Sequence, residues 1–196
     1  MRDIDIRRAL RREIDRLHGD DPDTSTVEEL GLCQGTVRVD MAIVNGTIHG
    51  YEIKSQHDTL ARLAGQCAVY SQALDLVTIV TAPAHSLKIA GLVPEWWGTW
   101  IAVQSGTEVR LETIREPRKN PQISAFAQAQ LLWRQEALLA LQSRGLAAGM
   151  KSKPRRELWN RLASELTVEE LGAIVRQSLK RRGDWRVHAP QALGGG

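Results

Sequence analysis

The sequence predicts an α/β protein: a mixed sheet flanked by helices, followed by a helical C-terminal extension. Alternating apolar and polar residues on both sides of Asn45-Gly46 are typical of a β-hairpin. A helical repeat and the β-branched run LVTIVTA come next, which gives the order hairpin, helix, strand. After Asn120-Pro121 only helical patterns remain. We therefore place an α/β core at residues 1–118, a basic helical extension at 119–188 and a flexible tail at 189–196.

An amphipathic helix is expected to open the chain, with arginines opposite its apolar face. That face is formed by Ile4, Ile6, Leu10, Ile14 and Leu17. The segment GDDPDTST then has the composition of a loop. Thr26 and Glu29 fit a helix capping box, but residues 26–29 also fit a short strand, and the sequence leaves both open.

The hairpin register follows from its two faces. A two-residue turn at Asn45-Gly46 would mix apolar and charged side chains on each face. A three-residue loop, Val44 to Gly46 with a left-handed glycine, separates them. It predicts one apolar face, formed by Val37, Val39, Met41, Ile43, Tyr51 and Ile53. The opposite face then carries Arg38, Asp40, Glu52 and Lys54.

The remaining elements follow from spacing and from breaker residues. Apolar positions from Asp58 to Leu74 predict a helix, and residues 85–90 predict a short one. A second hairpin is expected over residues 98–114, with Ser105-Gly106 at its turn. Helices are predicted over residues 122–143 and 154–166, and a capping box of Thr167 and Glu170 opens a last one to about residue 182.

Composition excludes several classes of protein. The chain has 196 residues, 42% of them hydrophobic and 25% charged, as in ordinary globular proteins. No stretch reaches the roughly 20 apolar residues of a membrane span, and the charged N-terminus is not a secretory signal. We therefore expect a cytoplasmic protein without a membrane partner. Two cysteines without a CxxC pair provide neither a disulfide framework nor a zinc site.

Charge is unevenly distributed along the chain. Residues 1–114 carry 11 basic and 16 acidic residues, whereas residues 115–196 carry 15 basic and 7 acidic ones. The basic part fits a polyanion, although a solvated helix surface would have the same composition. The arginines we expect to contact a phosphate backbone cluster at the ends of two helices: Arg155, Arg156, Arg181 and Arg182.

Two carboxylates and a lysine on one strand face indicate a metal site. Asp40 and Glu52 repel each other unless a cation lies between them, and hard oxygen ligands suit Mg²⁺ or Mn²⁺. The backbone oxygen of Ile53 would complete the ligand set, and Lys54 would orient water or offset transition-state charge. A solvated sheet face with an ordinary Lys54 ion pair is the competing interpretation. Because these side chains face away from the predicted apolar face, their substitution is expected to leave the fold intact.

The stretches RVD, GYEIKS and QCAVY resemble the PD-(D/E)XK nuclease superfamily, in particular its RecB-like branch and a bacterial and phage-associated group. The resemblance implies a restriction-endonuclease-like α-β-β-β-α-β core. It also implies that Asp40, Glu52 and Lys54 are the catalytic acids and lysine, with Val39-Asp40 in place of Pro-Asp. Gln66 and Tyr70 match the QxxxY element that contacts substrate or supports the site. Glu29 matches an additional metal-coordinating glutamate, although Glu28 lies beside it.

The function expected from these patterns is that of a Mg²⁺- or Mn²⁺-dependent nuclease, with DNA favoured over RNA as its substrate. The sequence leaves open whether the protein forms a homo-oligomer. Arg38 would contact a substrate phosphate or form a structural ion pair. Trp96, Trp97 and Trp100 would stack on bases or fill the core. Two other functions remain: a non-catalytic nucleic-acid-binding or scaffold module with the same fold, and a small-molecule phosphodiesterase that would not need the basic extension.

Overall fold

The computed structural model describes residues 1–182, and its mixed α/β fold confirms the predicted fold class. The strands are β1 (Ser25–Leu32), β2 (Val37–Val44), β3 (Ile48–Lys54), β4 (Leu76–Thr81), β5 (Gly98–Ser105) and β6 (Glu108–Arg115). The α-helices are α1 (Asp3–His18), α2 (Leu63–Ala73), α3 (Ser86–Ala90), α4 (Ala125–Ala129), α5 (Arg134–Ser143), α6 (Arg155–Glu165) and α7 (Val168–Arg181). Two short 3₁₀ turns are η1 (Cys33–Gly35) and η2 (Pro83–His85). The tail predicted at 189–196 lies outside the described residues.

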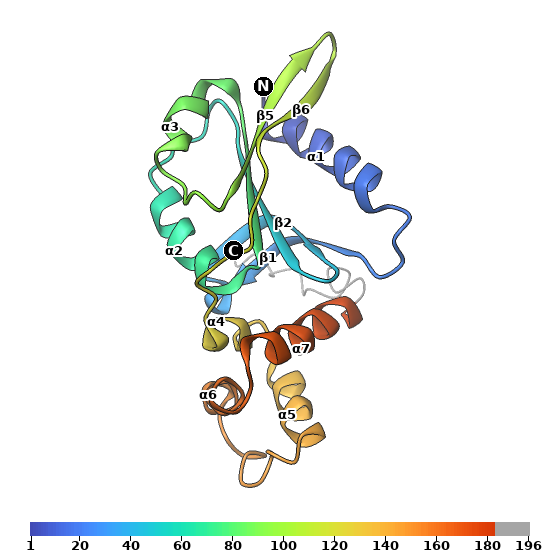
Figure 1. The fold of residues 1–196 in the computed structure, drawn as a ribbon, viewed down its shortest axis with the longest axis vertical. Helices are drawn as coiled ribbons and strands as arrows, with labels where there is room; N and C mark the ends of the chain where they lie inside the picture. The colour runs from blue at the N-terminus through green and yellow to red at the C-terminus, as the bar shows by residue number, and fades with distance from the viewer. Residues whose placement is uncertain (183–196) are drawn as a thin grey trace, which may run out of the picture.

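The six strands form one sheet in the order β1-β2-β3-β4-β5-β6. The first three strands are antiparallel, α2 connects β3 to a parallel β4, β5 is parallel to β4, and β6 returns antiparallel. Figure 1 shows α1 on one side of the sheet and α2 and α3 on the other, with α4 to α7 gathered at one end. Within residues 1–182 no helix has the length and apolar character needed to cross a membrane.

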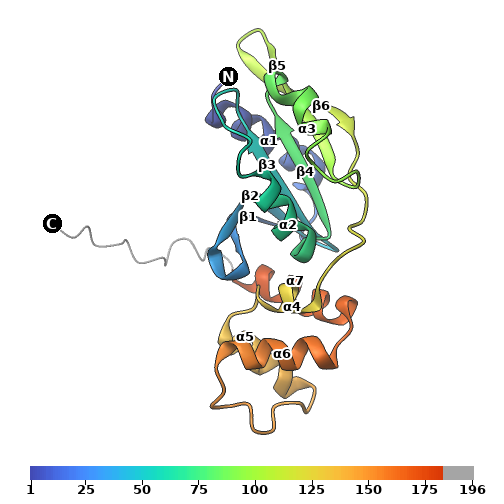
Figure 2. The ribbon, with the colours of Figure 1, turned by 90° about the vertical axis from the view of Figure 1, so that its left-hand side faces the viewer.

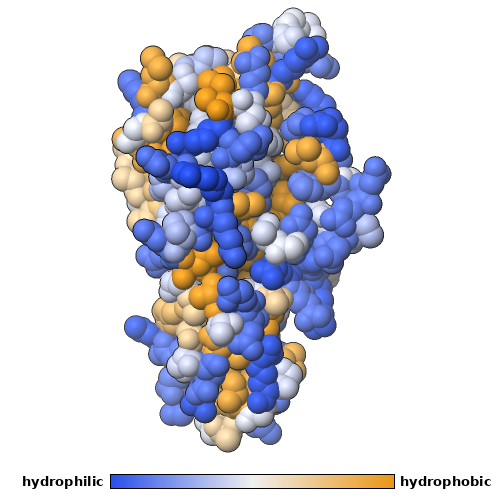
Figure 3. Space-filling model, viewed as in Figure 1, coloured by the Kyte–Doolittle hydropathy of each residue, from blue (hydrophilic) through white to orange (hydrophobic). Residues whose placement is uncertain are grey.

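A separate apolar cluster packs against each face of the sheet. On the α1 side, Ile6 and Leu10 pack with Met41, Tyr51 and Trp100. On the α2 side a larger cluster continues from the sheet into the helices of the extension, as far as Trp159 and Leu179. Figure 2 shows the extension seated against the end of the sheet, and Figure 3 shows apolar side chains where the two meet. The sheet and the extension therefore share one core.

Two predicted helices differ from those observed. The helix expected from Asp58 begins only at Leu63, because the Asp58 carboxylate accepts the Ser55 N–H at 2.7 Å and holds a turn before it. The helix expected over residues 122–143 is broken into α4 and α5. At the break, the indole N–H of Trp159 donates to the Leu132 carbonyl at 3.1 Å. Trp159 thereby satisfies a carbonyl that a continuous helix would have used itself.

The turn of the first hairpin differs from the prediction. Val44 pairs with Ile48, so the loop is Asn45 to Thr47 rather than Val44 to Gly46. Gly46 does not have a positive φ, contrary to expectation. Instead the side-chain oxygen of Asn45 accepts the Thr47 N–H at 3.1 Å and closes the loop. An Asx turn of this kind removes the need for a left-handed glycine.

The predicted apolar face is wrong at one end of β2. Met41, Ile43, Tyr51 and Ile53 share the α1-side cluster as expected, but Val39 packs on the α2 side. The cause lies in β1, where Glu29 has a φ of 53° between the pairs Glu28↔Met41 and Leu30↔Val39. This irregularity interrupts the alternation of side chains. Val39, on one side of it, therefore faces α2, whereas Met41 and Ile43, on the other side, face α1.

A neutral histidine on the face of β3 that points towards α1 makes the stability of the fold depend on pH. His49 stacks on Tyr51 and pairs with Thr78 Oγ1 at 2.8 Å, and burial lowers its pKa from 6.5 to about 3. The unfolded chain takes up a proton at this residue below pH 6.5 whereas the folded chain does not. The stabilisation is therefore complete above pH 6.5 and is lost as the pH falls towards 3.

We expect the His49→Gln variant to lose less stability than the wild type on acidification. Between pH 6.5 and 4.5 the difference should be on the order of 1 kcal/mol per pH unit in the free energy of unfolding. Urea unfolding monitored by circular dichroism measures it, with His57→Gln, a change at an exposed histidine, as the control. Parallel pH profiles for the wild type and His49→Gln would contradict this assignment.

Candidate active site

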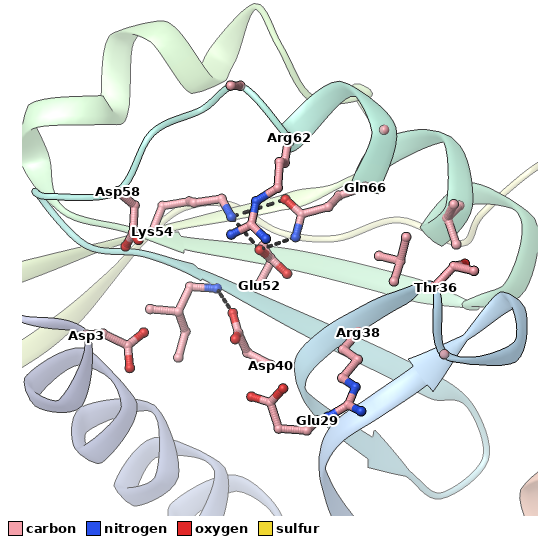
Figure 4. A pocket seen from close by; sticks show the side chains of 16 residues that line it. Asp3, Glu29, Thr36, Arg38, Asp40, Glu52, Lys54, Asp58, Arg62 and Gln66 are labelled. Carbon is pink, nitrogen blue, oxygen red and sulfur yellow. Dashed lines mark hydrogen bonds and ion pairs between the residues drawn. The ribbon is translucent and has the colours of Figure 1, made fainter. Parts of the chain in front are cut away.

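A pocket of about 780 Å³ lies over the part of the sheet where β2 and β3 separate. Its wall combines side chains from α1, the first three strands and α2 (Figure 4). The charged and amide side chains of this wall include Asp3, Glu29, Arg38, Asp40, Glu52, Lys54, Arg62 and Gln66. The residues predicted from β2, β3 and α2 therefore meet in one place.

The separation of β2 and β3 creates the pocket. Their pairing ends at Met41↔Tyr51. Beyond this pair the Asp40 carboxylate accepts the Ile53 N–H at 2.7 Å, in place of a carbonyl from the neighbouring strand. The Tyr70 hydroxyl, from α2, reaches both the Arg38 carbonyl at 2.8 Å and Glu52 Oε2 at 2.5 Å. Side chains thus connect the two strands where backbone pairing stops.

Glu52 and Lys54 form a buried ion pair on the α2 side of β3. Lys54 Nζ lies 2.5 Å from Glu52 Oε1, and the side chains are only 7% and 3% exposed, respectively. Gln66 donates to the same Oε1 at 2.6 Å and accepts from Lys54 Nζ at 3.1 Å. Both oxygens of Glu52 therefore receive donors from α2. The expectation that these groups could be replaced without affecting the fold assumed that they face away from the core, whereas both are buried, so we now expect their replacement to destabilise the fold.

Tyr70 remains a hydrogen-bond donor to Glu52. Burial and then the Glu52 charge raise the pKa of its hydroxyl far above the usual value, so the proton stays on the oxygen. Trp97 stacks on the Tyr70 ring with centroids 5.7 Å apart. Trp97, Trp96 and Trp100 are all buried, so of the two interpretations of these tryptophans the structure supports core packing.

Asp40 is an acid held in an unfavourable place for its charge. Burial raises its pKa to about 6, and repulsion from Glu52 adds to the rise, against the opposing effects of the Ile53 N–H and of Arg7. Both carboxylates line the same pocket. Two acids so placed favour a positive charge between them.

Arg7, from α1, supplies such a charge. Its Nη2 lies 3.0 Å from Asp40 Oδ1 and 3.7 Å from Glu29 Oε1, and its Nη1 donates to the Asp40 carbonyl at 3.2 Å. Glu29 is brought there by its positive φ, at the position of β1 that lies across from Asp40. The sequence did not single out Arg7, since Arg8, Arg11 and Arg12 share the same polar helix pattern.

The donor set suits a hard divalent cation only in part. Asp40 and Glu52, the two acids expected to bind the ion, line the pocket with Ile53, whose N–H donates to Asp40. Glu29 approaches Asp40 through Arg7 rather than by sharing a ligand position with Glu52. Over residues 1–182 no group of three or more His, Cys, Asp or Glu side chains is arranged to hold a metal ion. The site would use two acidic side chains and leave remaining positions to backbone and water.

Two exposed arginines line the pocket. Arg38 and Arg62 are exposed, line the pocket, and form no ion pair within the described part of the chain. Of the two roles considered for Arg38, the structural ion pair is therefore not observed. Arg62 was not predicted, because the helix was expected to begin before it.

The four arginines predicted in the extension do not lie together. Arg155 donates to Gln34 at 3.1 Å and stacks on Trp159, which places the start of α6, with exposed Arg156, beside η1. The η1 segment leads directly to Gly35 and Thr36 at the pocket. At the other end of the eight-residue β1, Lys180 pairs with Asp23. The end of α7, with Arg181, is thus roughly 25 Å from η1 along the strand.

Arg182 has a structural position. Its side chain is 9% exposed and pairs with Glu136, its Nη2 donates to the Leu131 carbonyl at 2.7 Å, and its guanidinium lies 4.2 Å from the Trp133 ring centroid. It therefore fastens the end of α7 to the start of α5. The sequence-based grouping of Arg182 with the phosphate-contacting arginines does not fit this placement.

Comparison with known proteins places the chain in a family. The family described as bacteriophage P4 protein cII matches residues 10–186, which include the pocket strands, α2 and the helical extension. The chain belongs to the bacteriophage P4 protein cII family. It is 28% identical over 160 residues to "Protein cII" of Enterobacteria phage P4, across 82% of this chain. The chain spans 60% of the length of that relative. No solved structure matches.

We expect Glu52→Gln to be strongly destabilising, because it leaves Lys54 buried and charged without its partner. The loss should be about 3 kcal/mol or more in the free energy of unfolding. The double variant Glu52→Gln, Lys54→Met removes both charges and should be more stable than Glu52→Gln alone. Urea unfolding of the wild type, Glu52→Gln, Lys54→Met and the double variant measures the coupling free energy between Glu52 and Lys54. Additive effects would mean that the ion pair contributes nothing to stability.

Proposed function

We propose that the protein is a metal-dependent nuclease that hydrolyses phosphodiester bonds in nucleic acid, with DNA favoured over RNA as its substrate. One observation carries the proposal: Asp40, Glu52 and Lys54 line the same pocket, and Lys54 is buried against Glu52. Burying an ion pair costs desolvation free energy that hydrophobic side chains of the same size would avoid. Charged groups kept at such a cost inside a pocket are candidates for chemistry.

The roles follow from the contacts. Asp40 and Glu52 would hold Mg²⁺ or Mn²⁺ with the backbone oxygen of Ile53, and the ion would supply Lewis acidity and a bound water of lowered pKa. Lys54 is placed to orient the attacking water or to offset negative charge on the phosphate. Gln66 and Tyr70 are positioning residues, since both hydrogen-bond Glu52.

The resemblance to PD-(D/E)XK nucleases adds support. The order α1-β1-β2-β3-α2-β4 agrees with the helix, three strands, helix and strand that the resemblance implies. Gln66 and Tyr70, the residues matching the QxxxY element, meet on the same carboxylate as the lysine of the acid-x-lysine pattern. These contacts add Gln66 and Tyr70 to the three residues that suggested the site.

The substrate class follows from the positive groups around the pocket. Arg38 and Arg62 lie at the pocket itself, and Arg155 and Arg156 lie beside η1. Such an arrangement fits a strand whose phosphates extend from the pocket towards α6. A small-molecule phosphodiester would need only the pocket arginines.

A non-catalytic nucleic-acid-binding module is the second candidate. It is favoured by the pairing of Glu52 with Lys54 and of Asp40 with Arg7, because the acids have counter-ions within the chain. Such a module would bind nucleic acid equally well with and without Mn²⁺, and would not cleave it.

Changing Asp40→Asn should abolish cleavage and preserve the fold. Asparagine keeps an oxygen to accept the Ile53 N–H but loses the charge that a cation requires. We expect a loss of at least about a hundredfold in the rate of DNA hydrolysis with Mn²⁺. The variant should fold, with a thermal unfolding midpoint lowered only by the loss of the Arg7 ion pair, since Arg7 keeps Asp3 and Glu29. The control is Glu95→Gln, which removes a charge from a side chain that is 94% exposed. Equal rates for Asp40→Asn and the wild type would refute the nuclease assignment.

Replacing Arg155 and Arg156 with alanine should weaken binding of DNA and lower its salt dependence. Each phosphate contact that is lost reduces the slope of log affinity against log salt by about one unit. Fluorescence anisotropy with a labelled oligonucleotide measures both quantities, in Ca²⁺ so that binding is separated from cleavage. Arg181→Ala, at the far end of β1, is the control and should bind as the wild type does. Unchanged affinity in the double variant would remove α6 from the substrate path.

A further inference from the structure

The guanidinium of Arg7 occupies a position that a divalent cation at Asp40 would need. Asp40 Oδ2 is taken by the Ile53 N–H, which leaves Oδ1 as the oxygen open to exchange. Oδ1 is the atom that Arg7 Nη2 contacts at 3.0 Å. The same nitrogen lies 3.7 Å from Glu29 Oε1 on the neighbouring strand.

Arg7 is held there firmly. The side chain is 16% exposed, and a second nitrogen, Nη1, donates to the Asp40 backbone carbonyl at 3.2 Å. Asp3, one helical turn earlier on α1, lies 3.4 Å from its Nε. Three carboxylates from α1, β1 and β2 therefore surround one guanidinium.

A metal ion and this guanidinium exclude each other. Mg²⁺ and Mn²⁺ bind carboxylate oxygens at about 2.1 Å. An ion on Asp40 Oδ1 would thus lie no more than about 5 Å from Arg7 Nη2, a separation at which two positive charges repel in a partly buried site. Asp40 is the one acid that both Arg7 and the cation would bind.

We infer that Arg7 is an internal counter-ion that competes with the divalent cation for Asp40, so that the metal binds by displacing the guanidinium from that carboxylate. This inference rests on the proposed metal site. Without metal, Arg7 neutralises the acids and holds α1 against β2. With metal, the cation takes over the first task and Arg7 is released into the pocket. Arg7 therefore sets the metal concentration at which the site fills.

The test is Mn²⁺ binding to the full chain, measured by isothermal titration calorimetry without nucleic acid. Arg7→Met removes the charge and keeps the length of the apolar stem. We expect its dissociation constant for Mn²⁺ to be lower than that of the wild type by about tenfold, because a charge-assisted hydrogen bond no longer has to be broken. Arg11→Met is the matched control: it removes the same charge from the same helix, but Arg11 pairs with Glu28 instead of Asp40.

Two further variants separate competition from a purely structural role. Arg7→Lys keeps the charge but loses the two-pronged contact, and should give an intermediate Mn²⁺ affinity. Adding Asp40→Asn to Arg7→Met should remove the gain in affinity. Thermal unfolding supplies a second readout: in chelator Arg7→Met should unfold below the wild type, and Mn²⁺ should raise its midpoint by more.

The outcomes distinguish this inference from the proposed function. An Arg7→Met or Arg7→Lys affinity equal to or weaker than that of the wild type overturns the inference and leaves the nuclease proposal standing. A tighter Mn²⁺ site in a chain that cleaves no nucleic acid overturns the nuclease proposal alone. Absence of Mn²⁺ binding in every variant overturns both.

Discussion

The site depends on the point at which β2 and β3 stop pairing. Past Met41 and Tyr51, backbone partners are replaced by the Asp40 carboxylate on the Ile53 N–H and by the Tyr70 hydroxyl on the Arg38 carbonyl. A buried backbone group without a partner is costly, so these side chains are needed for the strands to separate at all. The groups that open the pocket are therefore also members of the site.

Helix α2 completes this arrangement from one side and α1 from the other. Gln66 and Tyr70 fill the acceptor positions of Glu52, while Arg7 reaches Asp40 from the opposite helix. Each acid is held by a different layer of the fold. A shift of either helix relative to the sheet would change the separation of the two carboxylates, on which any bound cation depends.

Sequence patterns located much of this correctly, because they depend on local geometry. The strand and helix positions of Glu52, Lys54, Gln66 and Tyr70 follow from periods of two and four residues, and the contacts among these side chains agree with them. The strand at residues 26–29, one of two options, is part of β1. The second hairpin was also found, although its turn lies at Gly106-Thr107 and not at Ser105-Gly106, and the Thr167 cap was found as predicted.

What the sequence did not reveal depends on contacts between distant segments. The positive φ of Glu29 reverses the alternation of side chains in the first strands, and no residue type nearby marks it. Arg7 is one of several arginines on α1, and only the packing of the helix against β2 distinguishes it. The break between α4 and α5 likewise depends on Trp159, which lies in a later helix. In the sequence Arg182 is one of many basic residues of the extension, whereas in the fold its side chain forms a buried ion pair with Glu136.

The apolar cluster shared by the sheet and the extension bears on how the chain folds during synthesis. Its members range from Val27 in β1 to Leu179 in α7. The cluster is therefore complete only after residues that lie far apart in the sequence have come into contact. Until α7 has left the ribosome, the α2-side face of the sheet lacks part of its cover. A nascent chain in this state exposes apolar surface for most of its synthesis, which is the condition under which chaperones bind.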